Sequence, residues 1–258
     1  MGDNRKIGII DSGIGGLTVA KKFRELLPEE SIIYLGDNKN VPYGNKSEEE
    51  IYRLTKDMIE FLIEKDVKLI TIACNTISSI LDKYFLGYKV PIISIIEPVT
   101  DYIAKKDLQK VGVMATKFTI GSGIYEKLLK KKNKDIDVIL ESCPTLAEII
   151  DRGDYSDKDI RDIIYIHMNN ILKSSNLEDI ILGCTHYPIV LDKFKDISPD
   201  INFIDPAYEQ VLYVKELMDE KNIRSDKKDS SFEIYTTGDK DIYKNMIKAL
   251  SIEKPYII

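Results

Sequence analysis

Two of the three cysteines in this sequence occupy matching positions. Cys74 and Cys184 each follow a short apolar run that is typical of a buried strand, and each precedes a helix-like pattern. The positive end of a helix lowers the pKa of a nearby thiol and favours the reactive thiolate. The residues that directly follow the two sulfurs are polar: Asn75, Thr76, Thr185 and His186. These neighbours favour two reactive thiols, whereas Cys143, in front of a proline, is expected to be a small buried apolar residue.

Three kinds of chemistry use thiols in such surroundings. A cysteine protease pairs one thiol with a histidine, which leaves the second thiol without a role. A zinc site could use Cys74, Cys184 and His186, but a structural zinc ion takes four ligands and these spacings are not those of a zinc finger. In the third scheme, one thiolate removes a proton from a carbon atom and the other thiol returns a proton to the opposite face. This last scheme inverts a stereocentre and gives both thiols a role.

A glycine-rich turn near the N-terminus is a second candidate binding element. Gly13 and Gly15 fit the first two glycines of a dinucleotide-binding turn, but Thr18 occupies the third position. The charge of Asp11 would also face a pyrophosphate. The turn better fits a helix N-terminus at which Ser12 and backbone N–H groups bind a carboxylate, while Asp11 binds a cation such as an ammonium group. A tight turn capped by Asp11, with no ligand, is the alternative.

The order of the apolar runs predicts the scaffold that must position these residues. Short, nearly continuous apolar strands alternate with helical patterns, which indicates an α/β fold with mainly parallel sheets flanked by helices on both faces. The expected strands are Ile7–Ile10, Ser31–Leu35, Leu69–Ala73, Ile92–Ile95, Val111–Met114, Val138–Glu141, Ile180–Leu182, Asn202–Ile204 and Phe232–Tyr235. Segments 47–50 and 145–148 are capping-box signatures, and the first is expected to begin a helix that ends near Lys65.

A weak internal repeat suggests two related halves. KIGIIDSG at Lys6 is matched by KVGVMATK at Lys110, and ITIACNT around Cys74 is matched by IILGCTH around Cys184. Open α/β sheets bind ligands at the carboxyl ends of their strands, so two halves face to face would put Cys74 and Cys184 on opposite walls of one cleft. Two unrelated strand–helix units that look alike are the alternative.

Composition narrows the class of protein. A chain of 258 residues with 43% hydrophobic residues suits two domains with sizeable cores. The net charge of −6 disfavours a nucleic-acid groove. No apolar run approaches the roughly eighteen residues of a membrane span, and the first apolar run is too short for a secretory signal. We therefore expect a cytoplasmic protein without a nucleic-acid or membrane partner and without a disulfide framework.

Four motifs, in their order along the chain, resemble the aspartate/glutamate racemase family and, within it, glutamate racemase. They are DSGIGGL from Asp11, Pro42-Tyr43-Gly44, ACNT from Ala73 and GCTHYP from Gly183. The similarity extends to VGVMATKFTIGSGIYEKLL from Val111 and to YTTGD from Tyr235, so it covers nearly the whole chain. The related aspartate racemases typically carry a glutamate after Gly-Cys-Thr, so His186 points to the glutamate branch.

The resemblance implies two pseudo-symmetric α/β domains, an active site in the cleft between them, and neither a cofactor nor a metal. Residues 1–97 with 207–258 would form the N-terminal domain, and residues 98–206 the second domain. A thiolate/thiol pair would exchange the α-proton of glutamate, with Cys74 as the base for D-glutamate and Cys184 as the base for L-glutamate. The D-glutamate would supply bacterial peptidoglycan synthesis, and the protein would be a homodimer.

The resemblance also implies roles for particular residues. The expected catalytic residues are Cys74, Cys184, Asp11, His186 and Asp151. The expected substrate-binding residues are Asp11, Ser12, Pro42, Tyr43, Gly44, Asn75, Thr76, Thr116, Thr119, Thr185 and His186. Two rival functions share this fold: a racemase for another amino acid such as aspartate, and a non-catalytic protein that binds an amino acid.

One segment departs from the family pattern. After the Cys-Pro pair the family usually has Val-Pro-Leu-Val-Glu, whose glutamate supports the catalytic histidine. In this sequence Glu148 stands in place of the proline and Asp151 in place of the glutamate. Because aspartate is one carbon shorter, the sequence leaves open whether Asp151 or Glu148 supports His186. The other histidine, His167, lies in a helical pattern and is expected to be structural or exposed.

Overall fold

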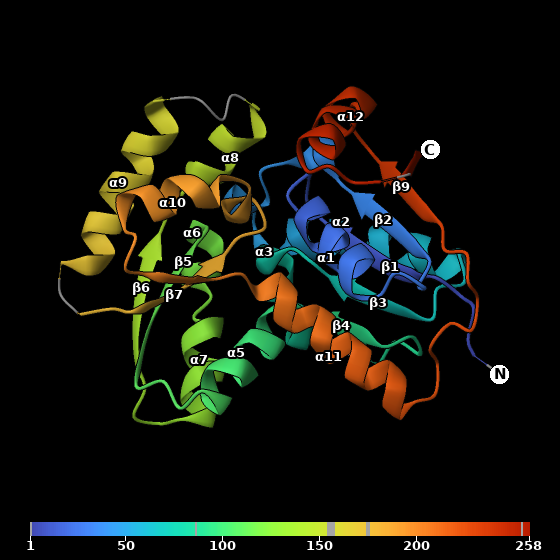
Figure 1. The fold of residues 1–258 in the computed structure, drawn as a ribbon, viewed down its shortest axis with the longest axis horizontal. Helices are drawn as coiled ribbons and strands as arrows, with labels where there is room; N and C mark the ends of the chain where they lie inside the picture. The colour runs from blue at the N-terminus through green and yellow to red at the C-terminus, as the bar shows by residue number, and fades with distance from the viewer. Residues whose placement is uncertain (1, 86, 154–157, 174–175, 254) are drawn as a thin grey trace.

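The structure, a computed structural model, describes residues 2–85, 87–153, 158–173, 176–253 and 255–258. Its strands form two parallel sheets with helices around them (Figure 1). Among the described residues, no helix is both long and apolar enough to cross a membrane.

The larger sheet has six strands in the order β10-β9-β2-β1-β3-β4. Their bounds are Ile7–Asp11 (β1), Ile32–Gly36 (β2), Leu69–Ile72 (β3), Ile92–Ser94 (β4), Phe232–Thr236 (β9) and Tyr256–Ile257 (β10). Every residue of β1, β2 and β3 is buried, as expected for apolar strands covered on both faces. The C-terminal segment therefore returns to complete the sheet begun by the N-terminus.

The smaller sheet has four strands in the order β6-β5-β7-β8. Their bounds are Lys110–Ala115 (β5), Asp137–Ser142 (β6), Asp179–Gly183 (β7) and Asn202–Ile204 (β8). The order of these strands repeats the order β2-β1-β3-β4 of the larger sheet. The sequence repeat is explained by this symmetry, because β1 corresponds to β5, and β3, before Cys74, corresponds to β7, before Cys184.

The described residues form helices between and after these strands. The α-helices are Leu17–Leu26 (α1), Glu48–Glu64 (α2), Asn75–Ser78 (α3), Leu81–Tyr84 (α4), Ile96–Lys105 (α5), Lys117–Gly121 (α6), Ile124–Lys132 (α7), Leu146–Asp151 (α8), Lys158–Leu172 (α9), Leu191–Ile197 (α10), Pro206–Glu220 (α11) and Lys240–Ala249 (α12). Short 3-10 helices lie at Asn38–Asn40 (η1), Tyr43–Asn45 (η2) and Tyr187–Val190 (η3).

The two expected capping boxes have different outcomes. Ser47 caps α2, and both hydrogen bonds of the box with Glu50 are present. At the start of α8, however, Thr145 makes no side-chain cap, so the second prediction is wrong. Thr145 has a helical backbone conformation rather than the extended one of a capping residue, and Glu148 pairs with Arg152 instead.

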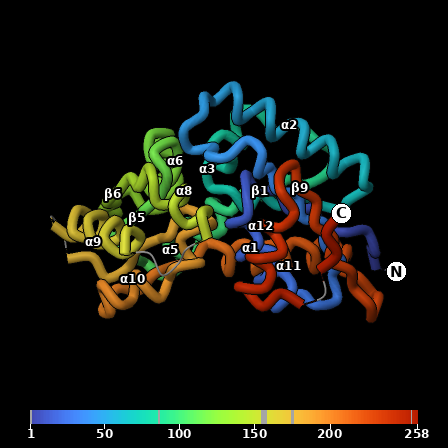
Figure 2. The backbone as a smooth tube through the Cα atoms, turned by 90° about the horizontal axis from the view of Figure 1, so that it is seen from above, coloured from blue at the N-terminus to red at the C-terminus, as the bar shows by residue number. Residues whose placement is uncertain are grey.

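One hydrophobic cluster extends through both halves of the molecule. It includes Ile9 of the larger sheet, Val113 of the smaller sheet, and Val211 and Val214 of α11. Figure 2 shows the smaller sheet and its helices on one side and the larger sheet, with both chain ends, on the other. The membership of the sheets supports the division into residues 1–97 with 207–258 and residues 98–206, which stays a proposal.

Candidate active site

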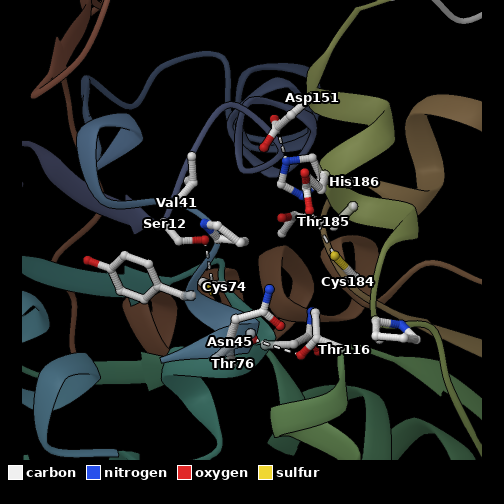
Figure 3. Close-up of a pocket in the computed structure, with 18 residues that line it drawn as sticks. Ser12, Val41, Asn45, Cys74, Thr76, Thr116, Asp151, Cys184, Thr185 and His186 are labelled. Carbon is white, nitrogen blue, oxygen red and sulfur yellow. Dashed lines mark hydrogen bonds and ion pairs between the residues drawn. The ribbon is translucent and has the colours of Figure 1, made fainter. Parts of the chain in front are cut away.

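A pocket lies where the carboxyl ends of the two sheets meet, and it brings together segments from both halves. Its lining residues are Ser12, Val41, Pro42, Tyr43, Gly44, Asn45, Cys74, Asn75, Thr76, Thr116, Pro144, Ala147, Glu148, Asp151, Gly183, Cys184, Thr185 and His186. Figure 3 shows Ser12 and Cys74 on one side, and Cys184, His186 and Asp151 on the other. The pocket therefore contains both cysteines, as the sequence repeat predicts.

Cys74 is the residue in front of the short helix α3 and is 5% exposed. Its Sγ lies 3.4 Å from Oγ of Ser12. Burial, with the nearby charge of Asp11, raises the pKa of this thiol to about 12, although the hydrogen bond with Ser12 acts in the opposite direction. The expectation that a helix N-terminus lowers the pKa of Cys74 is therefore wrong. A helix of one turn does not offset the loss of water and the neighbouring carboxylate.

Cys184 lies in a different electrostatic environment. Cys184 is not the capping residue of an α-helix. Thr185 and His186 follow it, and then the 3-10 helix η3 begins. This differs from the expected α-helix start. The sulfur instead lies 3.6 Å from Nδ1 of His186, so an imidazole rather than a helix end is the nearby group that can stabilise a thiolate.

Asp151 holds the other nitrogen of this imidazole. Its Oδ1 lies 2.8 Å from Nε2 of His186, whereas Glu148 forms an ion pair with Arg152 at 3.2 Å. The shorter acid reaches the ring because it ends α8 and lies beside the pocket. Burial on its own would lower the pKa of His186, but Asp151 and then Cys184 raise it well above the ordinary value. The question that the sequence leaves open is decided by this contact.

Asp11 lies behind the pocket and does not belong to its lining. It is fully buried, and its carboxylate accepts hydrogen bonds from the backbone N–H of Gly13 at 2.9 Å and from Oγ1 of Thr185 at 3.3 Å. Burial raises the pKa of Asp11 to about 6, against the opposing effects of His186 and these hydrogen bonds. Asp11 therefore connects the first half of the molecule to the segment that carries Cys184.

The glycine-rich turn is a contact surface between the two halves. A Cβ atom on Gly15 would lie 2.6 Å from Nδ1 of His186 and 2.6 Å from Oγ1 of Thr185. One on Gly16 would lie 2.4 Å from Cβ of Asp11. Because side chains of this protein already occupy the space over these glycines, the turn has no room for the pyrophosphate of a dinucleotide there.

The close approach at Gly15 gives a testable result. We expect Gly15→Ala to displace the imidazole of His186 from Cys184 and Asp151, and to lower kcat by about tenfold, which corresponds to about 1.4 kcal/mol. Gly121→Ala is the matched control, because nothing lies within 4 Å of a Cβ atom there. Steady-state kinetics with both enantiomers of the substrate make the comparison. Equal losses in the two variants would contradict the argument.

The segment with Pro42, Tyr43 and Gly44 forms part of the wall near Cys74. Asp37 fixes this segment, because its carboxylate accepts hydrogen bonds from Tyr43 Oη at 2.6 Å and from Asn40 Nδ2 at 2.9 Å. Gly44 approaches the other half closely, since a Cβ atom there would lie 3.0 Å from Cβ of Thr116. The three residues expected from the sequence therefore lie together in the pocket.

Three threonine hydroxyls join the halves beside α3. Oγ1 of Thr76 lies 3.0 Å from that of Thr116 and 3.3 Å from that of Thr119, and the last two lie 3.0 Å apart. Thr76 and Thr116 line the pocket, whereas Thr119 lies behind them. Next to them, the Nδ2 donor of Asn75 is buried and has no hydrogen-bond partner. Such a donor on a pocket wall can bind an acceptor of a ligand.

Sequence reasoning missed part of the lining. The additional lining residues are Val41, Asn45, Pro144, Ala147 and Gly183. Each of these residues either follows or precedes a predicted site residue or belongs to the 143–151 segment. Their position next to predicted site residues in the sequence could therefore have identified them. Tyr125, which hydrogen-bonds Asn75, was also missed, because nothing in a helical pattern distinguishes it from a core aromatic residue.

Other candidate residues have structural surroundings. Cys143 is fully buried in a hydrophobic cluster, as expected. Nδ1 of His167 lies 2.6 Å from Oε1 of Glu141, and neither residue lines the pocket. Among the residues that the structure describes, no group of three or more histidine, cysteine, aspartate or glutamate side chains is arranged to hold a metal ion.

The family pattern described as Asp/Glu/Hydantoin racemase matches residues 7–213. The chain therefore belongs to this racemase family. A glutamate racemase of Limosilactobacillus reuteri is 36% identical over 239 residues, which cover 92% of this chain and 89% of that protein.

Two solved structures are similar over nearly the whole fold. Glutamate racemase isoform RacE1 of Bacillus anthracis matches with a TM-score of 0.93 and 30% sequence identity. The match covers 99% of this chain and 97% of the RacE1 chain. Glutamate racemase of Francisella tularensis in complex with D-glutamate has a TM-score of 0.90 and 33% identity, with the same coverage. The two-sheet α/β architecture predicted from the sequence is thus confirmed.

Proposed function

We propose that this protein interconverts L-glutamate and D-glutamate by a two-cysteine acid/base mechanism without a cofactor. The observation that carries the proposal is the presence of Cys74 and Cys184 in one pocket, one from each half of the molecule. The relatives and solved structures described above are glutamate racemases, and one of them binds D-glutamate. Racemisation of an amino acid needs proton transfer at both faces of Cα, which two thiols on facing walls can supply.

The proton transfers balance over one turnover. When D-glutamate binds, the Cys74 thiolate takes the α-proton, so that a C–H bond breaks and an S–H bond forms. The Cys184 thiol then gives its proton to the opposite face of Cα, which yields L-glutamate. The enzyme is left with a Cys74 thiol and a Cys184 thiolate, which is the form that acts on L-glutamate. No external acid, base or oxidant is required.

The two thiolates depend on different neighbours. A protonated His186, held by Asp151, donates from Nδ1 to Cys184 and favours its thiolate. Cys74 has the Ser12 hydroxyl and the backbone N–H of Ile77 as hydrogen-bond partners, but burial and the charge of Asp11 raise its pKa to about 12. The ammonium group of a bound amino acid adds a positive charge to this wall, which offsets the charge of Asp11 and favours the Cys74 thiolate.

We infer the substrate contacts from the hydrogen-bonding groups that line the pocket. The unpartnered Nδ2 of Asn75, with the hydroxyls of Thr76 and Thr185, would bind a carboxylate of glutamate. Ser12 and the Pro42–Gly44 segment would complete the wall beside Cys74. Asp11, which lies behind the lining, would act through Thr185 and through its charge. Thr119 would act by holding Thr76 and Thr116.

An exchange experiment tests the proposed function and its rivals together. Protein dialysed against a chelator and supplied with no cofactor is incubated in deuterated water with L-glutamate, D-glutamate, or either enantiomer of aspartate or alanine. We expect circular dichroism of the glutamate samples to decay to zero, with deuterium at Cα by NMR. Faster exchange of aspartate would favour a racemase for that amino acid. Binding without exchange would favour a non-catalytic binding protein.

Three further expectations from the resemblance stay predictions. These are a homodimer, a cytoplasmic location and the supply of D-glutamate for peptidoglycan.

A further inference from the structure

Tyr125 of α7 connects the second half of the molecule to the Cys74 wall. Its side chain is buried, and its Oη donates a hydrogen bond of 2.7 Å to Oδ1 of Asn75, the residue after Cys74. Tyr125 itself is not part of the pocket lining, whereas Asn75 is. The hydroxyl therefore contacts a residue of the pocket from behind.

In the structure this hydrogen bond goes to the acceptor end of the Asn75 amide and leaves the donor end without a partner. A side-chain amide has an acceptor end and a donor end, and an exchange of the two ends costs little unless neighbours distinguish them. Tyr125 occupies the acceptor, Oδ1, while the donor, Nδ2, is buried and has no partner. A buried donor without a partner is destabilising by about 1–3 kcal/mol, and a hydrogen bond from Nδ2 to an acceptor of a ligand would remove this cost.

The same tyrosine packs against the segment that carries the second thiol. A Cβ atom on Gly183, the residue before Cys184, would lie 3.4 Å from Cε2 of Tyr125. The ring thus fills the space beside the end of β7. Burial, followed by the charges of Cys184 and Asp205, raises the pKa of Tyr125, so its hydroxyl stays protonated and can donate at any pH used for assay.

We propose that Tyr125 is a positioning residue that orients the Asn75 amide, so that Nδ2 is presented to an acceptor oxygen of the substrate, a carboxylate oxygen. The inference rests on the proposed function, because it takes a carboxylate oxygen of the substrate as the group that meets this wall. Tyr125 touches neither the substrate nor the reacting atoms. It acts by keeping one donor aimed at the pocket before the substrate arrives, which lowers the cost of binding.

Tyr125→Phe tests this role because it removes only the hydroxyl. The contact between Asn75 and a carboxylate is made equally in the ground state and the transition state. We therefore expect KM for L-glutamate and for D-glutamate to rise by about 3- to 10-fold, the range of one hydrogen bond, with kcat changed by less than about twofold. Tyr243→Phe is the matched control: Tyr243 is also buried and also donates to an asparagine Oδ1, that of Asn38, which does not line the pocket.

A double-mutant cycle separates positioning from general stability. In an Asn75→Ala background the amide is absent, so Tyr125→Phe should raise KM no further. The same increase in both backgrounds, or unchanged KM in the single variant, would overturn the inference. A fall in kcat with unchanged KM would do so as well. Thermal unfolding of each variant identifies any that fails to fold.

The failure of the proposed function has a different signature. If the wild-type protein racemises no glutamate, that function is wrong whatever Tyr125 does. The orientation of the amide is then read by NMR from the side-chain N–H resonances of Asn75 in the wild type and in Tyr125→Phe. A shift of these resonances supports the inference, and identical spectra overturn it.

Discussion

Cys74→Ala and Cys184→Ala are each expected to abolish racemisation, with a loss in kcat of at least about 10³-fold. Inversion at Cα needs a base on one face and an acid on the other, so one remaining thiol cannot complete a turnover in either direction. The two variants should fold, because each change removes only one sulfur atom from a buried cluster at the pocket wall and leaves the strands and the other core side chains in place. Circular dichroism with each enantiomer measures the loss, and thermal unfolding confirms the fold.

Cys143→Ala is the control for these variants. Cys143 is buried in the hydrophobic cluster of the second half and does not line the pocket. Its replacement should therefore change stability slightly and leave turnover nearly intact. Near-normal activity of either Cys74→Ala or Cys184→Ala would exclude the two-base mechanism, even if the protein proved to be a racemase.

Asp151→Asn is expected to lower kcat from L-glutamate by about 10- to 100-fold, equivalent to one or two pKa units at His186. Without the carboxylate, burial lowers the pKa of His186 and the ring loses its proton. The neutral ring no longer favours the Cys184 thiolate, which is the base for L-glutamate. Substrate affinity should change little, because Asp151 acts on His186 and not on the carboxylates of the substrate.

The reverse direction provides a check on the same variant. The equilibrium constant of a racemase is one, so kcat/KM must fall equally for both enantiomers, and any difference in kcat must be matched in KM. Glu148→Gln is the control, because Glu148 pairs with Arg152 and not with His186. If Glu148→Gln reduced activity and Asp151→Asn did not, the contact seen at His186 would not be the one used in catalysis.

Most of the fold follows from local patterns in the sequence. Nine predicted strands are present, with each end within one residue of its predicted position, because apolar runs of this length between helical patterns are typical of doubly covered parallel strands. β10 was missed, since two residues, Tyr256–Ile257, are too few to show a pattern. The second capping box was wrong because Thr145 has a helical backbone conformation and Glu148 pairs with Arg152 instead of with Thr145.

For the site, the sequence by itself determined which residues could do chemistry. Cys74 and Cys184 at equivalent strand ends, with polar neighbours, identify two candidate thiols, because open α/β sheets bind ligands at the carboxyl ends of their strands. The tertiary structure alone decided that Asp151 rather than Glu148 meets His186, that burial raises the pKa of Cys74, and that Tyr125 hydrogen-bonds Asn75. These contacts and the pKa of Cys74 depend on the distances between elements that are far apart in the chain and on the exclusion of water between them. A local sequence pattern contains no information on either.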